Sequence, residues 1–314
     1  MLKKSWLFLL FFTCLFASCD QHHKNKKSKA PAMDIGYNLS APDRVYSLPK
    51  KLKEISGITE IDSLRIACIQ DEREIVFIYD LNSGQIIRKT DYGYKGDYEG
   101  VARVDSTLYI LRSDGEITKI ENFEAEKFVR STFHSGIPWK DDEGICYDPT
   151  NNYLLITTKE IPRKGTENRD KRFIYGFNLT SKKPVPEPVF TIDLSAIDSF
   201  ALANHIKVPM KDKKKDKSKD PDIRFLVSDL AIHPVTGKLY LLSSADKLLF
   251  VFNTKNELEY IGRLKPDLFV QPEGITFMKN GDMYISNEGQ KKSATLVRFN
   301  YKPAKPDSLV GSSK

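Results

Sequence analysis

One acidic position recurs along this sequence and could carry ionic chemistry. In five copies of a short motif, an acidic residue or a serine stands before a glycine or leucine and an apolar run. These positions, 43, 44, 86 and 44 residues apart, are Ser56, Glu99, Glu143, Asp229 and Glu273. Four carboxylates in one ring would repel one another unless positive charge lies among them. Because hard carboxylate oxygens without Cys or clustered His favour Ca²⁺ over zinc, we expect calcium ligands among Glu99, Glu143, Asp229 and Glu273.

The segments that position these side chains have the pattern of β-strands. A second and a third apolar run follow each copy of the motif, and a fourth, weaker run precedes the next copy. The runs are short, rich in Val, Ile, Tyr and Phe, and separated by turn residues, as in 81–85, 235–238 and 279–282. Four short antiparallel strands in every forty-odd residues are typical of a β-propeller blade, so the fold class is all-β.

The spacing predicts five blades, with six as the alternative because the 86-residue step could contain a degenerate blade. We assign residues 189–194 as the fourth strand of the third blade and about 195–225 as a Lys-rich insertion with a helical turn or two. The last copy is one strand short, and residues 44–49 have a strand pattern just before the first copy. This N-terminal strand is therefore expected to complete the last blade and close the ring, which removes the exposed sheet edges. The propeller then spans about 44–302, and 303–314 is a disordered tail.

The blade geometry brings two acidic rows to one end of the central channel. The start of each first strand and the end of each second strand lie on the same face, because the two strands are antiparallel. The second row consists of Asp71, Glu72, Asp114, Glu160, Asp246 and Glu288. Three interpretations stay open: a metal ion, a cationic ligand, or carboxylates that bond to backbone N–H groups of a neighbouring blade. Arg112 and Lys159 could neutralise part of the charge.

The N-terminus predicts an envelope lipoprotein. Residues 1–18 combine Lys3, Lys4 and an apolar run with small residues directly before Cys19, as in a bacterial lipobox. We expect cleavage before Cys19, lipid on this cysteine, and a polar tether over 19–43. An ordinary signal peptide is the alternative. The expected location is a membrane surface that faces away from the cytoplasm, with the outer membrane favoured.

Composition excludes several other classes. The net charge of +7 comes largely from Lys-rich runs at 24–29 and 211–220 that carry no interleaved aromatic residues, so no nucleic-acid partner is expected. The sequence contains no motif of a serine hydrolase, zinc protease or P-loop enzyme. Cys68 and Cys146 each lie within an apolar run, which indicates buried free thiols.

The series of motifs beginning at residues 56, 98, 142, 227 and 272 resembles the SdiA-regulated, YjiK-like family of bacterial envelope proteins, which is distantly similar to NHL-repeat propellers. The resemblance covers nearly the whole predicted domain. It implies a five-bladed propeller, membrane anchoring and a calcium site at Glu99, Glu143, Asp229 and Glu273. Ser56 departs from the acidic pattern, so the contribution of the first blade to that site is open.

Two functions of different classes follow. The favoured one is a non-catalytic module that binds an unknown small ligand or an envelope protein, anchored to the membrane through Cys19 and monomeric. The alternative is a calcium-dependent hydrolase of the lactonase, esterase or phytase type, by analogy of fold alone. In that enzyme the metal would polarise a carbonyl or phosphoryl oxygen, and Glu143 or Glu273 would act as the base.

Overall fold

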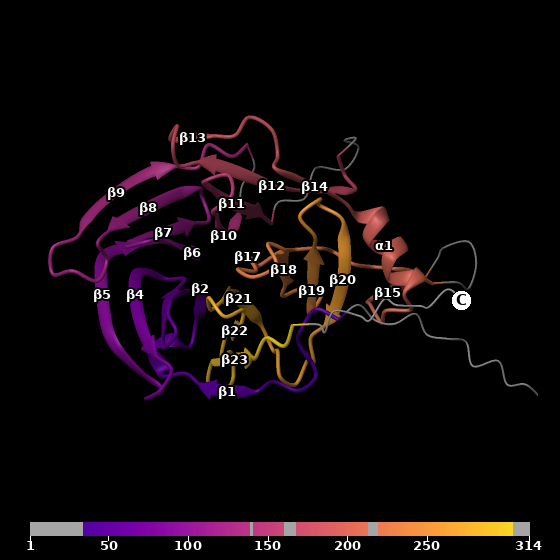
Figure 1. Ribbon diagram of the computed structural model, residues 1–314, viewed down its shortest axis with the longest axis horizontal. Coiled ribbons are helices and arrows are strands. Elements are labelled where there is room, and N and C mark those ends of the chain that lie inside the picture. Colours follow the sequence, from indigo (N-terminus) through magenta and orange to yellow (C-terminus); the bar gives the residue numbers. More distant parts are fainter. Residues whose placement is uncertain (1–33, 139–140, 160–167, 213–218, 304–314) are drawn as a thin grey trace, which may run out of the picture. The chain divides into compact units, whose positions relative to one another are not determined.

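The computed structural model describes residues 34–138, 141–159, 168–212 and 219–303. In this part of the chain, five antiparallel sheets follow one another around a common axis, with the first strand of each sheet nearest the centre (Figure 1). The protein is a five-bladed β-propeller, which confirms the predicted fold class and blade number. Cys19, the residues expected to form the signal peptide, and Glu160 lie outside the described residues.

The first two blades and the fourth are regular four-stranded sheets. Blade 1 contains β2 (Ile55–Asp62), β3 (Arg65–Gln70), β4 (Arg73–Asp80) and β5 (Gln85–Lys95). Blade 2 contains β6 (Tyr98–Val104), β7 (Thr107–Arg112), β8 (Glu116–Glu121) and β9 (Val129–His134). Blade 4 contains β17 (Asp229–Ile232), β18 (Leu239–Ser243), β19 (Leu248–Phe252) and β20 (Leu258–Arg263).

Blade 5 joins the two ends of the propeller. Its strands are β21 (Pro272–Phe277), β22 (Met283–Asn287), β23 (Thr295–Phe299) and, at the outer edge, β1 (Arg44–Ser47). The pairing of β1 with β23 aligns Val45 with Val297 and Tyr46 with Leu296. A short 3₁₀ helix, η1 (Lys50–Leu52), then leads into blade 1. The prediction that an N-terminal strand completes the last blade is confirmed.

Blade 3 departs most from the regular pattern. It contains β10 (Asp142–Asp148), β11 (Tyr153–Thr158) and β12 (Lys171–Asn178), and two short strands pair with β12: β13 (Lys183–Pro184) and β14 (Phe190–Asp193). Helix α1 (Leu194–Ala203) follows directly, and the side chain of its N-cap residue Asp193 accepts a hydrogen bond from the Ser195 amide.

A hairpin of β15 (Met210–Asp212) and β16 (Lys219–Pro221) comes after α1. The sequence did not predict this hairpin, because its strands have three residues each, β15 is fully exposed, and neither alternates apolar with polar residues. The helix is also longer than the one or two turns expected.

The glycines of the repeated motif explain how the first strands pack around the channel. A Cβ atom on Gly57 would lie 2.8 Å from the amide nitrogen of Val101, and one on Gly144 would lie 2.7 Å from the Cα of Asp229. Gly100 and Gly274 meet the backbone of the next blade in the same way. Glycine is required at these four positions because neighbouring backbones approach closely. The glycines therefore form a narrow ring near one end of the channel.

The core consists of apolar layers between adjacent blades and beneath α1. Cys68 and Cys146 are buried and free, as predicted. Burial raises the pKa of the Cys146 thiol well above its usual value, so this thiol stays protonated. Among the described residues, none of the helices has the length and apolar composition needed to cross a membrane.

Candidate functional site

Three glutamates occupy equivalent places at one end of the channel. Glu99, Glu143 and Glu273 are each the second residue of a first strand, in β6, β10 and β21. Burial raises the pKa of Glu99 to about 9, with repulsion from Glu143 and Asp97 as further causes. Burial likewise raises the pKa of Glu273 to about 7 and raises the pKa of Glu143. We call these three residues the glutamate cluster.

Lys159 supplies the positive charge nearest to the glutamate cluster. It follows β11 in blade 3, and its Nζ lies 2.7 Å from Oε1 of Glu143. Only 5 % of the Glu143 side chain is exposed, against 51 % for Lys159. The Lys159 charge also opposes the rise in the pKa of Glu99 and of Glu273. One ammonium group thus interacts with three carboxylates. Their pKa values stay raised, so its single positive charge does not offset the effects of burial and mutual repulsion.

Asp229 and Ser56 differ from the glutamates because backbone groups engage them. Oδ1 of Asp229 accepts a hydrogen bond from the Leu230 amide, and Oδ2 accepts one from the Ile275 amide in blade 5, each at 2.8 Å. The hydroxyl of Ser56 donates to the carbonyl of Tyr98 in blade 2 at 2.7 Å. Both side chains therefore link neighbouring blades, and the contact of Asp229 is of the kind that one of the three interpretations of the motif proposed.

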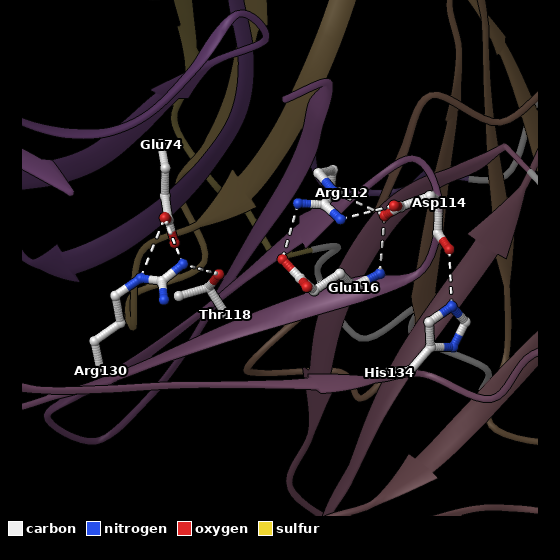
Figure 2. Close-up of polar contacts among 7 residues, drawn as sticks. All are labelled: Glu74, Arg112, Asp114, Glu116, Thr118, Arg130 and His134. Carbon is white, nitrogen blue, oxygen red and sulfur yellow. Dashed lines mark hydrogen bonds and ion pairs between the residues drawn. The ribbon is translucent and has the colours of Figure 1, made fainter. Parts of the chain in front are cut away.

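The second acidic row is partly neutralised within blade 2. Figure 2 shows Arg112 between two carboxylates, with its Nη2 at 2.7 Å from Oδ2 of Asp114 and its Nη1 at 2.9 Å from Oε1 of Glu116. His134 Nε2 lies 2.9 Å from the carbonyl oxygen of Asp114. Arg112 holds the pKa of Asp114 below its usual value. Asp114 is thus paired within its own blade, as the sequence allowed.

Other members of that row have separate surroundings. Asp246 accepts hydrogen bonds from the backbone amides of Arg224 and Phe225, which anchor the segment before β17. Burial raises the pKa of Asp71, with repulsion from Glu54 as the next cause. The pKa of Glu288 is also raised, by burial and then by repulsion from Asp71 and Glu54. A second acidic group therefore lies where blades 1 and 5 meet.

A polar residue two places before each glutamate completes the cluster, and the sequence interpretation missed it. A side-chain hydrogen bond with Asp97, which protonated Glu99 donates, contributes to the raised pKa of Glu99, and one with Gln271 opposes the rise at Glu273. Asp141 occupies the same place before Glu143 and raises its pKa by repulsion. The signal was present in the repeat itself, because every motif with a glutamate has a polar residue at this offset.

The glutamate cluster fits a hard cation in its donor chemistry but not in its arrangement. Carboxylate oxygens are the ligands that calcium prefers. Within the described ranges, however, no group of three or more His, Cys, Asp or Glu side chains is placed to hold a metal ion. Asp229 already accepts backbone hydrogen bonds with both oxygens, and Glu143 binds Lys159. The four predicted ligands therefore do not form a preorganised calcium site.

His233 has a structural role in this fold. Its Nδ1 accepts hydrogen bonds from the amides of Val235 and Thr236, and its Nε2 lies 2.7 Å from the hydroxyl of Tyr37. Burial lowers the pKa of His233 to about 4, so the imidazole is neutral at physiological pH. This contact ties the segment before β1 to blade 4.

Comparisons with known proteins agree with the fold. The family model described as SdiA-regulated matches residues 47–291. A glutaminyl cyclase from Myxococcus xanthus has 11 % identity and a TM-score of 0.52, over 84 % of this chain and 97 % of the other. A streptogramin B lyase has 11 % identity and a TM-score of 0.46, over 82 % and 97 % of the two chains. A nidogen/laminin complex has 14 % identity and a TM-score of 0.45, over 74 % and 72 %. No curated protein matches the sequence significantly.

Proposed function

The chain belongs to the SdiA-regulated family of β-propellers, and from this premise we propose that it is a binding module of the cell envelope that takes up a cationic ligand at the glutamate cluster. The observation that carries the proposal is the sharing of one lysine by three glutamates, of which Glu143 is buried and Glu99 and Glu273 are half-buried. A bound cation would offset the repulsion that raises the pKa of Glu99 and Glu273. Calcium is the first cation to test, because the donors are all carboxylates.

A rigid propeller suits binding because the cluster is mounted on strands rather than on loops. Each glutamate lies near the start of a first strand, directly before a glycine that packs the strand's backbone against the next blade. Such mounting fixes the backbone positions from which the three side chains extend. The described part of the chain places no hydroxyl or thiol nucleophile beside a histidine base at the cluster, which favours binding over covalent catalysis.

Calorimetry on chelator-stripped, full-length protein in detergent tests the proposal. We expect calcium to bind the unmodified protein and to fail to bind Glu99→Gln/Glu273→Gln. Glu126→Gln is the matched control, because this glutamate is exposed in the turn between β8 and β9. Absence of calcium binding, together with no binding of lysine- or arginine-containing peptides, would refute a cation site.

The hydrolase alternative has one supporting observation. A carboxylate with a pKa of about 7, such as Glu273, has the basicity that suits a general base near neutral pH. Turnover of an ester, lactone or phosphoester that is lost in Glu273→Gln and in chelator would favour this alternative. If none of these substrates is turned over, the binding module remains as the proposed function.

The lipid anchor is a separate part of the proposal. The lipobox before Cys19 supports attachment to a membrane, where two or more acyl chains give stable anchoring. Mass spectrometry of the mature N-terminus should find acyl chains on Cys19. In Cys19→Ala the protein should stay unprocessed or leave the membrane fraction, and an acyl-free mature terminus at another residue would contradict the prediction.

A further inference from the structure

A cavity of about 180 Å³ lies at the other end of the channel from the glutamate cluster. Three consecutive residues of every first strand line it, at 58–60, 101–103, 145–147, 230–232 and 275–277. The turns after these strands add Pro149, Pro234 and Lys279. The glycine ring lies between this cavity and the glutamate cluster, because Gly57, Gly100, Gly144 and Gly274 directly precede the first lining residue of their strands. We call this cavity the axial cup.

The inner wall of the axial cup is aliphatic. One residue from each blade lines it, although the side chains of these five residues, each no more than 3 % exposed, pack mainly between the blades: Ile58, Val101, Ile145, Leu230 and Ile275. An engineered protein cavity of about 150 Å³ with an aliphatic lining stays dry and binds benzene. The axial cup is of similar size and lining, so it suits an apolar group of roughly six to ten heavy atoms.

The outer part of the axial cup is polar and carries a net positive charge. The guanidinium of Arg103 is held by the Glu60 carboxylate, by the Glu60 carbonyl at 2.7 Å and by the Asp105 carbonyl at 2.7 Å. Lys279 is exposed, and the structure gives its ammonium group no ion pair within the described ranges. The hydroxyl of Thr276 accepts a hydrogen bond from the Glu60 amide, which leaves its own hydrogen available to donate. The lip therefore offers one unpaired cation and one hydroxyl donor.

From the cavity, its lining and its charge we propose that the axial cup binds a small carboxylate with an apolar body, such as a short-chain fatty acid or an aromatic acid. The apolar body would lie against the apolar inner part of the axial cup. The carboxylate would face Lys279 and the Thr276 hydroxyl. The buried thiol of Cys146 lines the same cup, but its raised pKa keeps it protonated, so the site binds without covalent chemistry.

The two ends of the channel thus select opposite charges. A carboxylate is repelled by the glutamate cluster and attracted by Lys279. A cation is attracted by the glutamate cluster and repelled by Lys279. The axial cup is independent of the proposed cation site, since no residue is common to the two and the glycine ring separates them. Failure of calcium binding would leave this inference intact.

The test uses ligand-observed NMR and calorimetry on the full-length protein with benzoate, hexanoate, hexanol and hexylamine as probes. We expect both acids to bind, hexanol to bind at least tenfold more weakly than hexanoate, and hexylamine not to bind at the cup. Lys279→Met should weaken hexanoate binding by about tenfold and leave hexanol unchanged. Lys255→Met is the matched control, because this lysine is exposed in the β19–β20 turn and is not among the residues that line the axial cup.

Ile232→Phe provides a second variant that reduces the free volume of the axial cup without changing its charge, because Ile232 lines the cup and is only half-buried. It should weaken both acids and the alcohol, with a melting curve that shows the fold is retained. The inference is overturned if neither acid binds, if hexylamine binds as tightly as hexanoate at the cup, or if Lys279→Met leaves hexanoate binding unchanged. Loss of hexanoate binding in Glu99→Gln/Glu273→Gln would also overturn it, by placing the acid at the other end of the channel.

Discussion

Replacing Lys159 by methionine removes the positive charge that the glutamate cluster shares. Methionine keeps most of the apolar stem, so the change isolates the loss of the ammonium group. Its Nζ lies 2.7 Å from a carboxylate that is almost fully buried, and its charge also acts on Glu99 and Glu273. The variant therefore leaves three carboxylates without a cation, and the folded state should lose stability wherever they are ionised.

The size of the loss follows from the burial of the two partners. Removing one partner of a fully buried pair costs about 3–5 kcal/mol, whereas an exposed pair contributes about 0–1 kcal/mol. Because half of the Lys159 side chain is exposed while Glu143 is buried, we expect about 1–2 kcal/mol. For a domain of this size, that loss lowers Tm by roughly 2–8 °C.

The pH dependence fixes the sign of the effect. The folded-state pKa values of Glu99, Glu143 and Glu273 are raised, so the folded protein binds more protons than the unfolded chain between the unfolded and the folded pKa. Their unfavourable contribution is therefore largest at high pH and disappears as pH falls towards 4.5. Removing Lys159 increases that contribution, so the penalty should be large at pH 8 to 9 and small at pH 5.

Differential scanning calorimetry of Lys159→Met, Lys159→Arg and the unmodified protein at pH 5, 7 and 8.5 measures the effect. Lys159→Arg keeps the charge and should resemble the unmodified protein. Calcium should stabilise Lys159→Met more than the unmodified protein, because the competing ammonium group is gone. An unchanged Tm at pH 8.5, or a loss that is equal at pH 5 and pH 8.5, would refute the idea that Lys159 neutralises the glutamate cluster.

Three further predictions concern polar groups that hold the blades together. Asp229→Ala should destabilise the fold by about 1–3 kcal/mol in urea unfolding, equally with calcium and with chelator, because it frees buried amides; a loss confined to calcium-loaded protein would indicate a ligand instead. Arg130→Met should cost about 3–5 kcal/mol in urea unfolding, because it leaves the fully buried Glu74 carboxylate, whose Oε2 lies 2.8 Å from Arg130 Nη2, without its cationic partner (Figure 2). Glu74→Met in the same chain should restore most of that loss. The pKa of His233 is depressed to about 4, so its stabilising contribution is complete above pH 6.5 and is lost as pH falls towards 4. His233→Asn should therefore be less sensitive than the unmodified protein by roughly 3 kcal/mol over that range, and equal acid sensitivity of the two proteins in calorimetry would contradict this account.

The fold was predictable because the features that determine the strands and blades of a propeller are short-range patterns in the sequence. Alternating apolar residues and turn residues predict the strands, and the spacing of 43 or 44 residues predicts the blades. The missing last strand and the early one at 44–49 together predict closure by β1. The β15–β16 hairpin escaped prediction because short, exposed strands leave no apolar pattern.

The candidate site was less predictable because a motif gives the place of a side chain but not its partner. The acidic residue of each copy was predicted to reach one end of the channel, and three glutamates do gather there with Lys159. Nothing in the sequence distinguished Asp229, whose partner is the Ile275 amide of another blade. Such a contact depends on the register between blades, which only the folded structure contains.

Side-chain length and the following residue together explain how the motif divides into two roles. The two short side chains, Ser56 and Asp229, bond to backbone groups of the next blade, whereas the three glutamates act on one another and on Lys159. Asp229 is also the member that precedes leucine instead of glycine, so the motif places no glycine of blade 4 at its junction with blade 5. Its carboxylate spans that junction by accepting the Ile275 amide. The same repeat thus provides linkers where the side chain is short and ionisable groups at the channel end where it is longer by one methylene.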